Sequence, residues 1–427
     1  MKRFDNPPRE EWTAICQRPA IDVSSLQQTV AAVFSNVAAY GDTALKDYTA
    51  QFDGVDLNDL RVAPEALAAA AAQVPEKLQQ AIQQAHDNIE AFHRAQQTPE
   101  VVVTTQEGVK CWQKKYPIEK VGLYVPGGTA PLLSTVLMLA LPAKIAGCKE
   151  VVLCTPPQKD GKVNPVLLYT AALCGITQVF ILGGAQAIAA MALGTATVPK
   201  VDKIFGPGNQ YVTAAKQYAS LQQVAIDMPA GPSEVLVAVD ASATPAFVAA
   251  DLLSQAEHGS DSQVVLVTTA PEQLTAITEA LAEQLELLPR KALAKAALEN
   301  SKMVSFTATA TAIDFINSYA PEHYIINVED PTPYVAGVAH AGSVFIGPYT
   351  PESAGDYASG TNHTLPTNGY ARQYSGVNLD SFLKAITFQE ITATGLQNLG
   401  SAVMEMAAAE GLEGHKNAVA VRLNKDT

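Results

Sequence analysis

The sequence lacks a hydrophobic run long enough to cross a membrane. Its most apolar stretch, TVLMLALPAKIAG, is interrupted by Pro142 and Lys144 and falls short of the roughly 20 residues that a membrane helix needs. The opening stretch, MKRFDNPPREEW, contains no apolar core of the kind found in secretion signals. We therefore expect a cytoplasmic protein without a membrane partner.

Basic residues are also scarce. The 28 lysines and arginines are outnumbered by 42 aspartates and glutamates, which gives a formal charge of −14. A polyanion would be repelled by this charge, and no basic stripe interleaved with aromatic residues offsets it, so nucleic acid is excluded as a partner. With 427 residues and a hydrophobic fraction of 48%, the chain is expected to form two or more well-packed domains.

Cysteines are few and form no CxxC pair. The odd count of five argues for reduced thiols and leaves too few for a structural zinc site. Cys148, Cys154 and Cys174 lie in apolar stretches, where small buried core residues are expected.

Short apolar runs that end in glycine or proline fill the middle of the sequence. VGLYVPGG, VVLCTPP, VFILGGAQ and KIFGPGN are each followed by a helix-like segment, and a second series begins at EVLVAVD and continues through SQVVLVTTA, HYIINV and AGSVFIG. This alternation predicts parallel sheets. Apolar residues three and four apart predict helices over 24–50 and 64–97.

The predicted fold is therefore α/β, with two Rossmann-like parallel-sheet domains, a helical N-terminal arm and a small helical C-terminal extension. The larger α/β domain is expected at 234–380, with the helical arm of 21–120 packed against it. The other expected parts are an N-terminal tail at 1–20, a dinucleotide-binding domain at 121–233 and the C-terminal extension at 381–427.

Three glycine turns follow predicted strands of the first series. They are Gly127-Gly128, Gly183-Gly184 and Gly206-Pro207-Gly208. Such turns place backbone N–H groups and a helix N-terminus where a pyrophosphate can bind. Each turn alone is commonly just turn geometry, and Tyr211 stands where a GxGxxG motif needs its third glycine. The clustering of three turns favours a cofactor site.

Polar ligand-type residues gather in four places in the second half of the sequence. Gln255 and His258 are three apart and so share a helix face, whereas Glu322 and His323 are adjacent. The other pairs are Asp356 with His363, in a loop rich in small residues, and Glu410 with His415. A shell of Gln, His, Asp and His suits zinc. A lone histidine is more commonly a cap or a solvated side chain, which is the interpretation for His86, His93 and His340.

The sequence around these residues resembles that of histidinol dehydrogenases. The resemblance covers nearly the whole chain from about Tyr124 to the C-terminus and is looser in the part before Tyr124. The resemblance rests on eight ordered motifs: YVPGGTAPLLSTVLMLALPAKIAG, ILGGAQAIAAMALGT, KIFGPGNQYVTAAK, DMPAGPSEVLV, DLLSQAEHG, APEHY, GDYASGTNHTLPT and EGLEGHKNA.

The resemblance implies a site and a reaction. It implies two-step oxidation of L-histidinol to L-histidine through the aldehyde, with two NAD reduced and one zinc per site. It also implies a homodimer in which His415 and Glu410 reach the neighbouring subunit's site. The implied zinc ligands, which also contact substrate, are Gln255, His258, Asp356 and His415. The implied NAD contacts are Tyr124, Gln186 and Asn209. The other implied substrate contacts are Ser233, His323, His363 and Glu410, and Glu322 and His323 form the implied acid/base pair.

In this scheme His323 removes the hydroxyl proton, Glu322 activates water to hydrate the aldehyde, and zinc orients the substrate. No cysteine lies in the motifs that carry this chemistry, so direct hydration is favoured over a thioester route. Two alternatives stay open: a relative that oxidises a different alcohol, and a zinc hydrolase in which Glu322 activates water. A scaffold protein would not need an acid/base pair beside a metal shell.

Overall fold

Two compact units make up the computed structural model. The described residues are 1–19, 23–127, 131–229 and 231–423. The main unit comprises Met1–Gln96 and Ile118–Ser381, and the small unit comprises Gln97–Pro117 and Phe382–Thr427.

The first sheet of the main unit has five parallel strands in the order β6-β5-β4-β7-β8. Its strands are β4 (Lys120–Tyr124), β5 (Glu150–Thr155), β6 (Gln178–Ile181), β7 (Lys203–Phe205) and β8 (Ala225–Ile226). The accompanying helices are α6 (Leu133–Ala146), α7 (Pro165–Leu173), α8 (Gly184–Leu193) and α9 (Gln210–Leu221). The strand order reverses between β4 and β7. Ligands of open α/β sheets bind at the carboxyl ends of the strands at such a reversal.

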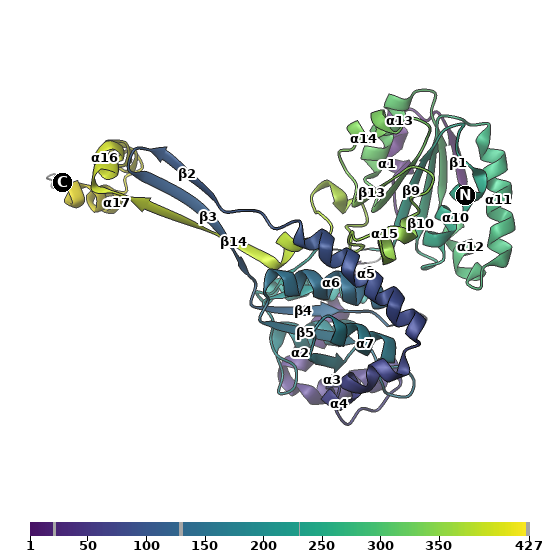
Figure 1. Cartoon of the computed structure of the whole chain (residues 1–427), viewed down its shortest axis with the longest axis horizontal. Helices are drawn as coiled ribbons and strands as arrows, with labels where there is room; N and C mark the ends of the chain where they lie inside the picture. Colours follow the sequence, from purple (N-terminus) through teal and green to yellow (C-terminus); the bar gives the residue numbers. More distant parts are fainter. Residues whose placement is uncertain (20–22, 128–130, 230, 424–427) are drawn as a thin grey trace. The chain divides into compact units, whose positions relative to one another are not determined.

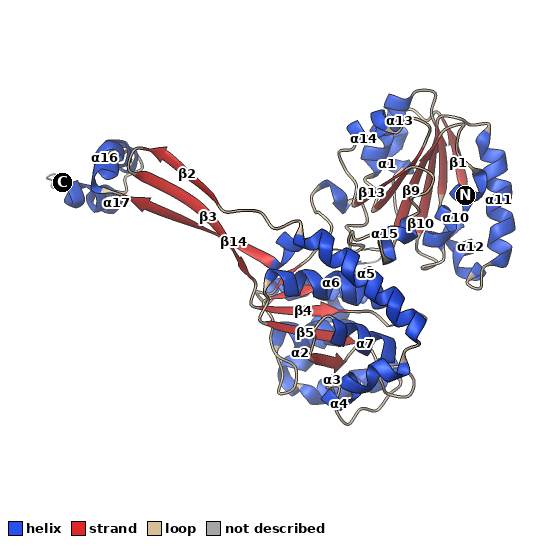
Figure 2. Cartoon of the chain, viewed as in Figure 1, coloured by secondary structure: helices blue, strands red, loops and turns tan. Residues whose placement is uncertain are grey.

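The second sheet has six parallel strands in the order β1-β11-β10-β9-β12-β13. Its strands are β1 (Lys2–Asp5), β9 (Glu234–Val239), β10 (Gln263–Thr268), β11 (Lys302–Ser305), β12 (His323–Asn327) and β13 (Ser343–Ile346). Its helices are α10 (Pro245–Ala256), α11 (Gln273–Leu287), α12 (Lys291–Glu299), α13 (Thr309–Tyr319), α14 (Thr332–Ala336) and α15 (Glu352–Tyr357). Every residue of β9 and β10 is buried, as a strand covered on both faces requires (Figure 2).

The two sheets have the same strand order. If β4–β8 are counted as strands 1 to 5 of the first sheet and β9–β13 as strands 1 to 5 of the second, both have the order 3-2-1-4-5, and β1 is added at the edge beside β11. The expected pair of Rossmann-like halves is thus confirmed.

The N-terminal helices pack mainly on the helices of the first sheet, and not mainly against 234–380 as expected. They are α2 (Val23–Tyr40), α3 (Asp42–Asp53), α4 (Pro64–Ala69) and α5 (Glu76–Arg94). Helix α2 packs on α8 and α9, α4 on α7, and α5 on α6. Helix α5 also contacts 234–380, because Asn88 donates to the carbonyl oxygen of Ala358 at 2.8 Å and His93 lies beside Asn362. Among these contacts, the predicted packing against 234–380 therefore holds for part of α5 alone. The apolar face of α2 explains the difference, because Val30, Val33, Phe34 and Val37 complete the core beside the first sheet.

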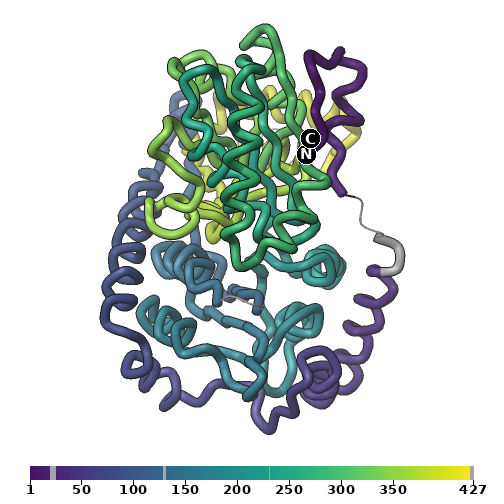
Figure 3. Tube along the Cα trace, turned by 90° about the vertical axis from the view of Figure 1, so that its right-hand side faces the viewer, coloured from purple at the N-terminus to yellow at the C-terminus, as the bar shows by residue number. Residues whose placement is uncertain are grey.

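Residues 1–19 are more than a tail. They supply β1 at the edge of the second sheet and the short helix α1 (Trp12–Ile15), whose Trp12 is buried among Phe306 and Phe315. In Figures 1 and 3 this purple segment lies beside the green elements of that sheet.

The small unit is built on an antiparallel sheet in the order β14-β3-β2. Its strands are β2 (Val101–Gln106), β3 (Val109–Pro117) and β14 (Leu383–Ile391), and its helices are α16 (Ala393–Ala409) and α17 (Glu413–Ala420). The purely helical extension predicted for 381–427 is therefore wrong at β14, and the helical arm is wrong over β2 and β3.

Short 3-10 helices complete the structure at Arg9–Glu11, Ala70–Gln73, Tyr370–Arg372, Leu379–Phe382 and Val421–Leu423. None of the helices within the described ranges is both long and apolar enough to span a membrane.

Candidate active site

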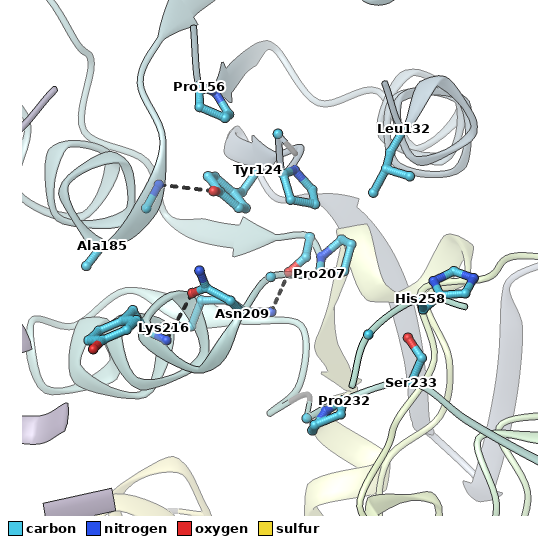
Figure 4. Close-up of a pocket in the computed structure, with 18 of the residues that line it drawn as sticks. Tyr124, Leu132, Pro156, Ala185, Pro207, Asn209, Lys216, Pro232, Ser233 and His258 are labelled. Atoms are coloured by element: carbon cyan, nitrogen blue, oxygen red, sulfur yellow. Dashed lines mark hydrogen bonds between the residues drawn. The ribbon is translucent and has the colours of Figure 1, made fainter. Parts of the chain in front are cut away.

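A single cavity of about 1420 Å³ in the main unit brings together most of the residues singled out in the sequence. Those that line it are Tyr124, Gln186, Asn209, Ser233, His258, Glu322 and His363. Figure 4 shows Tyr124 and Asn209 on one side of this cavity and Ser233 and His258 on the other. The first sheet contributes its carboxyl edge and the second sheet its amino edge, since Ser233 and Glu322 directly precede β9 and β12.

Tyr124, the last residue of β4, precedes the first glycine turn and is hydrogen-bonded to the second. Its hydroxyl accepts a hydrogen bond from the backbone N–H of Gly184 at 3.0 Å, and burial raises the pKa of this phenol. Gly184 begins α8 with φ of +60°, a backbone angle that glycine adopts readily. Gly128 of the first turn lies outside the described residues.

The N-termini of α8 and α9 border the cavity. Gln186 lies in the first turn of α8 with 1% of its surface exposed, and its Oε1 has no hydrogen-bond partner within the described chain. Asn209 caps α9, because its Oδ1 accepts the N–H groups of Tyr211 and Val212 at 3.0 and 3.1 Å. Two helix N-termini can receive an anionic group. The unpaired amide oxygen of Gln186 can accept a hydrogen bond from a ligand hydroxyl or N–H group.

The third glycine turn is held by a buried ion pair. The N–H of Gly206 donates to Asp227 Oδ2 at 2.8 Å, and its carbonyl accepts from Lys216 Nζ at 2.8 Å. Lys216 and Asp227 also pair with each other, with 3% and 0% of their side chains exposed. The loop that leads into α9 is therefore fixed through both backbone groups of Gly206.

Glu322 and His323 lie at the start of β12, and both are buried. Glu322 Oε2 accepts the N–H of Glu234 at 2.8 Å, and His323 Nδ1 lies 2.9 Å from the carbonyl oxygen of Glu234. Burial raises the pKa of Glu322 to about 8. Burial opposes protonation of His323, but the carboxylates of Glu352, Glu322 and Asp356 hold its pKa well above the usual value.

Potential metal ligands lie beside His323. Gln255 lies in the last turn of α10 with its Nε2 2.9 Å from His323 Nδ1, while its buried Oε1 has no partner among the described residues. Burial lowers the pKa of His258 and so favours the neutral imidazole that binds metals. Asp356 on α15 places Oδ1 3.5 Å from His323 Nε2. Burial disfavours its charge, but nearby His323 keeps its pKa below the usual value.

Sequence reasoning missed Glu352. It is 1% exposed, and its Oε2 has no partner in the described part of the chain. Its ligand-type atom lies within 4.8 Å of those of His323 and Asp356, which makes a compact potential metal group. Glu352 and Asp356 are four residues apart on α15, so their i,i+4 spacing was the available signal.

The remaining candidates lie in different surroundings. His363 Nε2 lies 3.1 Å from Thr135 Oγ1 and its Nδ1 3.0 Å from the carbonyl oxygen of Asp356. Burial lowers the pKa of His363. Glu410, after α16, and His415, within α17, belong to the small unit.

His86 and His93 are buried in the face of α5 rather than solvated or capping, which corrects their sequence interpretation. All five cysteines are free, and none lines the cavity as far as the structure describes it. Cys154 and Cys174 are buried, as predicted, whereas Cys148 is partly exposed.

Comparison with known proteins decides the family. The model of the histidinol dehydrogenase family matches residues 16–423. The chain belongs to the histidinol dehydrogenase family. It is an oxidoreductase, as its relatives are, and this excludes the zinc hydrolase alternative.

Individual relatives of the histidinol dehydrogenase family match over almost their full length. The histidinol dehydrogenase of Bacteroides thetaiotaomicron is 57% identical over 424 residues, 99% of each chain. The chloroplastic histidinol dehydrogenase of Arabidopsis thaliana is 55% identical over 95% of this chain and 87% of its own. The crystal structure of histidinol dehydrogenase from Elizabethkingia anophelis has a TM-score of 0.97 at 54% identity, covering 99% of this chain and 98% of that one.

Proposed function

We propose that this chain oxidises L-histidinol to L-histidine through L-histidinaldehyde, with zinc bound and two NAD reduced in turn, at the end of histidine biosynthesis. One observation carries the proposal. A single cavity joins the helix N-termini beside Tyr124, Gln186 and Asn209 to His258 and Glu322 at the amino edge of the second sheet. That arrangement suits a dinucleotide on one side and a small substrate on the other.

In this proposal NAD binds at the strand-order reversal of the first sheet. Its pyrophosphate faces the N-termini of α8 and α9, where the positive ends of the helix dipoles favour negative charge. Tyr124, Gln186 and Asn209 contact the dinucleotide. The unpaired Oε1 of Gln186 supports this assignment, because a buried amide oxygen without a partner is costly unless a ligand satisfies it.

Zinc fits the donors beside His323. Gln255 offers a buried amide oxygen without a partner among the described residues, His258 a neutral imidazole and Asp356 a carboxylate. We assign these three ligands to one subunit and His415 to the neighbouring subunit of a homodimer, together with the substrate contact Glu410. Bound zinc would fix the position of the substrate through its imidazole and amino nitrogens. Ser233 and His363 would hold the substrate from the cavity wall.

His323 is arranged to accept a proton at Nε2 in the zinc-loaded site, where the charge of the metal would offset the carboxylates that raise the pKa of His323. In the tautomer with the hydrogen on Nδ1, that nitrogen donates to the carbonyl oxygen of Glu234, and Nε2, which has no hydrogen-bond partner within the described residues, is the proton acceptor. In the first step His323 takes the hydroxyl proton as the carbon loses a hydride to NAD, which leaves the aldehyde.

Glu322 then takes a proton from water, the hydroxide adds to the aldehyde carbon, and protonated His323 returns its proton to the resulting alkoxide, which gives the hydrate. The raised pKa of Glu322, about 8, places this carboxyl near neutrality, where proton transfer in both directions is efficient. His323 removes a hydroxyl proton from the hydrate as the second hydride leaves, and the product is the carboxylic acid. Direct hydration needs no thiol, and burial raises the pKa of Cys148 and Cys174 to about 12.

We place this enzyme in the cytoplasm. Five unpaired cysteines, an odd number, support a reducing compartment.

The stoichiometry of NADH tests the reaction directly. Purified protein is expected to form two NADH per L-histidinol consumed, because oxidation of an alcohol to an acid removes two hydrides. A chelator is expected to abolish the rate, and added zinc to restore it. NADH formation from other amino or polar alcohols, and none from histidinol, would move the substrate to another alcohol and contradict the proposal.

His258→Ala is expected to reduce bound zinc from about one per site, with an affinity loss of at least about 10- to 100-fold, since the shell loses one protein ligand. Zinc content by atomic absorption after dialysis measures this loss. His86→Gln is the matched control, because His86, Asp87 and Glu90 form another compact group of ligand-type side chains on α5. Full zinc content in the His258 variant would refute the assignment of His258 as a ligand.

A further inference from the structure

Glu234 contacts three of the proposed active-site residues through its backbone. It is the first residue of β9 and 1% exposed. Its N–H donates to Glu322 Oε2 at 2.8 Å, and its carbonyl oxygen lies 2.9 Å from His323 Nδ1. The same carbonyl accepts a hydrogen bond from Gln255 Nε2 at 3.2 Å. A shift of the backbone at Glu234 would therefore move both members of the acid/base pair and a proposed zinc ligand.

The carboxylate of Glu234 is held by Arg18. Arg18 Nε donates to Oε1 at 3.0 Å and Nη2 to Oε2 at 2.8 Å, which is a two-bond fork. The side chains are 11% and 2% exposed, so water screens the pair little. Asn368 adds a backbone N–H to Oε1 at 2.8 Å.

Arg18 is itself fixed on its other faces. Its guanidinium lies 3.7 Å from the ring centroid of Tyr319, and Nη2 donates to the carbonyl oxygen of Tyr319 at 2.7 Å. Tyr319 is fully buried in the core beside the second sheet. The guanidinium thus links the N-terminal segment, α13 and the start of β9 at one point behind the acid/base pair.

We propose that Arg18 and Glu234 form a positioning pair that fixes the backbone of Glu234 and, through it, the placement of Glu322, His323 and Gln255. This inference rests on the proposed function, in which Glu322 and His323 carry the chemistry. Neither Arg18 nor Glu234 touches the substrate in this role. A misplacement of about 1 Å at reacting groups costs on the order of 100-fold in rate, so a rigid clamp at this backbone has a direct effect on turnover.

Arg18→Met in the zinc-loaded full chain tests the positioning role. We expect kcat to fall about 10- to 100-fold, with the KM for NAD unchanged within about twofold, because the proposed NAD contacts lie on the first sheet. Arg18→Lys is expected to give an intermediate kcat, since an ammonium can meet the charge of Glu234 but not form the fork. Arg9→Met is the matched control. Arg9 lies in the same segment and pairs with Asp314, but both are exposed, so kcat should not change.

A double variant tests whether a lower kcat comes from lost positioning or from lost folding. Removing Arg18 alone leaves a buried unpaired carboxylate, which is strongly destabilising. Arg18→Met with Glu234→Gln removes both charges while the backbone groups of residue 234 remain. We expect it to fold and to keep the reduced kcat, because the fork is still missing.

A second cavity makes chemical rescue possible. It measures about 870 Å³, and Arg9, Cys16, Arg18 and Arg372 are among its lining residues. In Arg18→Ala, millimolar guanidinium is expected to restore kcat several-fold, whereas urea, of similar shape but neutral, should not. This difference separates the loss of a charged fork from a general loss of packing.

Wild-type kcat in the folded Arg18 variants, with only a lower melting temperature, would overturn the positioning role. Equal effects of guanidinium and urea would do the same. If His323→Asn also kept normal turnover, the failure would lie in the proposed acid/base pair rather than in its positioning.

Discussion

His323→Asn is expected to lower turnover by about two to four orders of magnitude while zinc stays bound. Asparagine can still donate a hydrogen bond to the carbonyl oxygen of Glu234, which His323 Nδ1 approaches at 2.9 Å. It cannot accept and hold the proton that Nε2 would take. The measurement is the rate of NADH formation from L-histidinol, together with zinc content. Near-normal turnover would remove His323 from the proposed chemistry.

His340→Asn is the control for this prediction, because His340 lines the second cavity, whereas His323 lies among Glu234, Glu322 and Asp356. The zinc content of the His323 variant carries separate information. His323, Glu352 and Asp356 form a compact ligand-type group of their own. Loss of zinc from the His323 variant, with zinc retained in His258→Ala, would place His323 rather than His258 in the metal shell.

The two sheets were predictable because their signal is local. Buried parallel strands are nearly continuous apolar runs, and β9 and β10 are of this kind. The turns after β4, β6 and β7 could be expected to meet, since the carboxyl ends of parallel strands share one edge. The gathering of Tyr124, Gln186 and Asn209 at one cavity follows from that rule.

The packing of the N-terminal helices was not predictable from periodicity. The pattern shows that α2 has an apolar face but not which surface covers it, and the structure places Val30 and Phe34 in the core beside the first sheet. Strand β14 was not predicted from the sequence for a related reason. Most of its residues are exposed, and it pairs with β3 more than 260 residues away, Leu383 with Pro117.

The support behind the candidate site was also hidden from the sequence. Arg18 and Glu234 are 216 residues apart, and Glu234 reads simply as the start of an apolar strand. The second sheet brings β9 and β12 side by side, which places Glu234 between Arg18 and the acid/base pair. The residues proposed to carry the chemistry could be recognised in the sequence by their type and spacing. Which backbone groups hold them in place depends on the order of the strands in the sheet, which the sequence does not show.

Gly206→Ala is expected to cost about 3 kcal/mol or more in the free energy of unfolding and to weaken NAD binding at least about tenfold. Gly206 has φ of +128°, and an added Cβ would overlap the backbone oxygen of Tyr124. That oxygen cannot move aside easily, because β4 lies between β5 and β7 in the sheet. Urea unfolding and NAD titration measure the two effects.

Gly147→Ala is the matched control, with φ of +86° but nothing within 4 Å of an added Cβ, so it should cost only about 1 kcal/mol in the free energy of unfolding. Equal losses in the two variants would show that backbone angle alone, and not the contact between the third glycine turn and β4, makes glycine necessary at position 206.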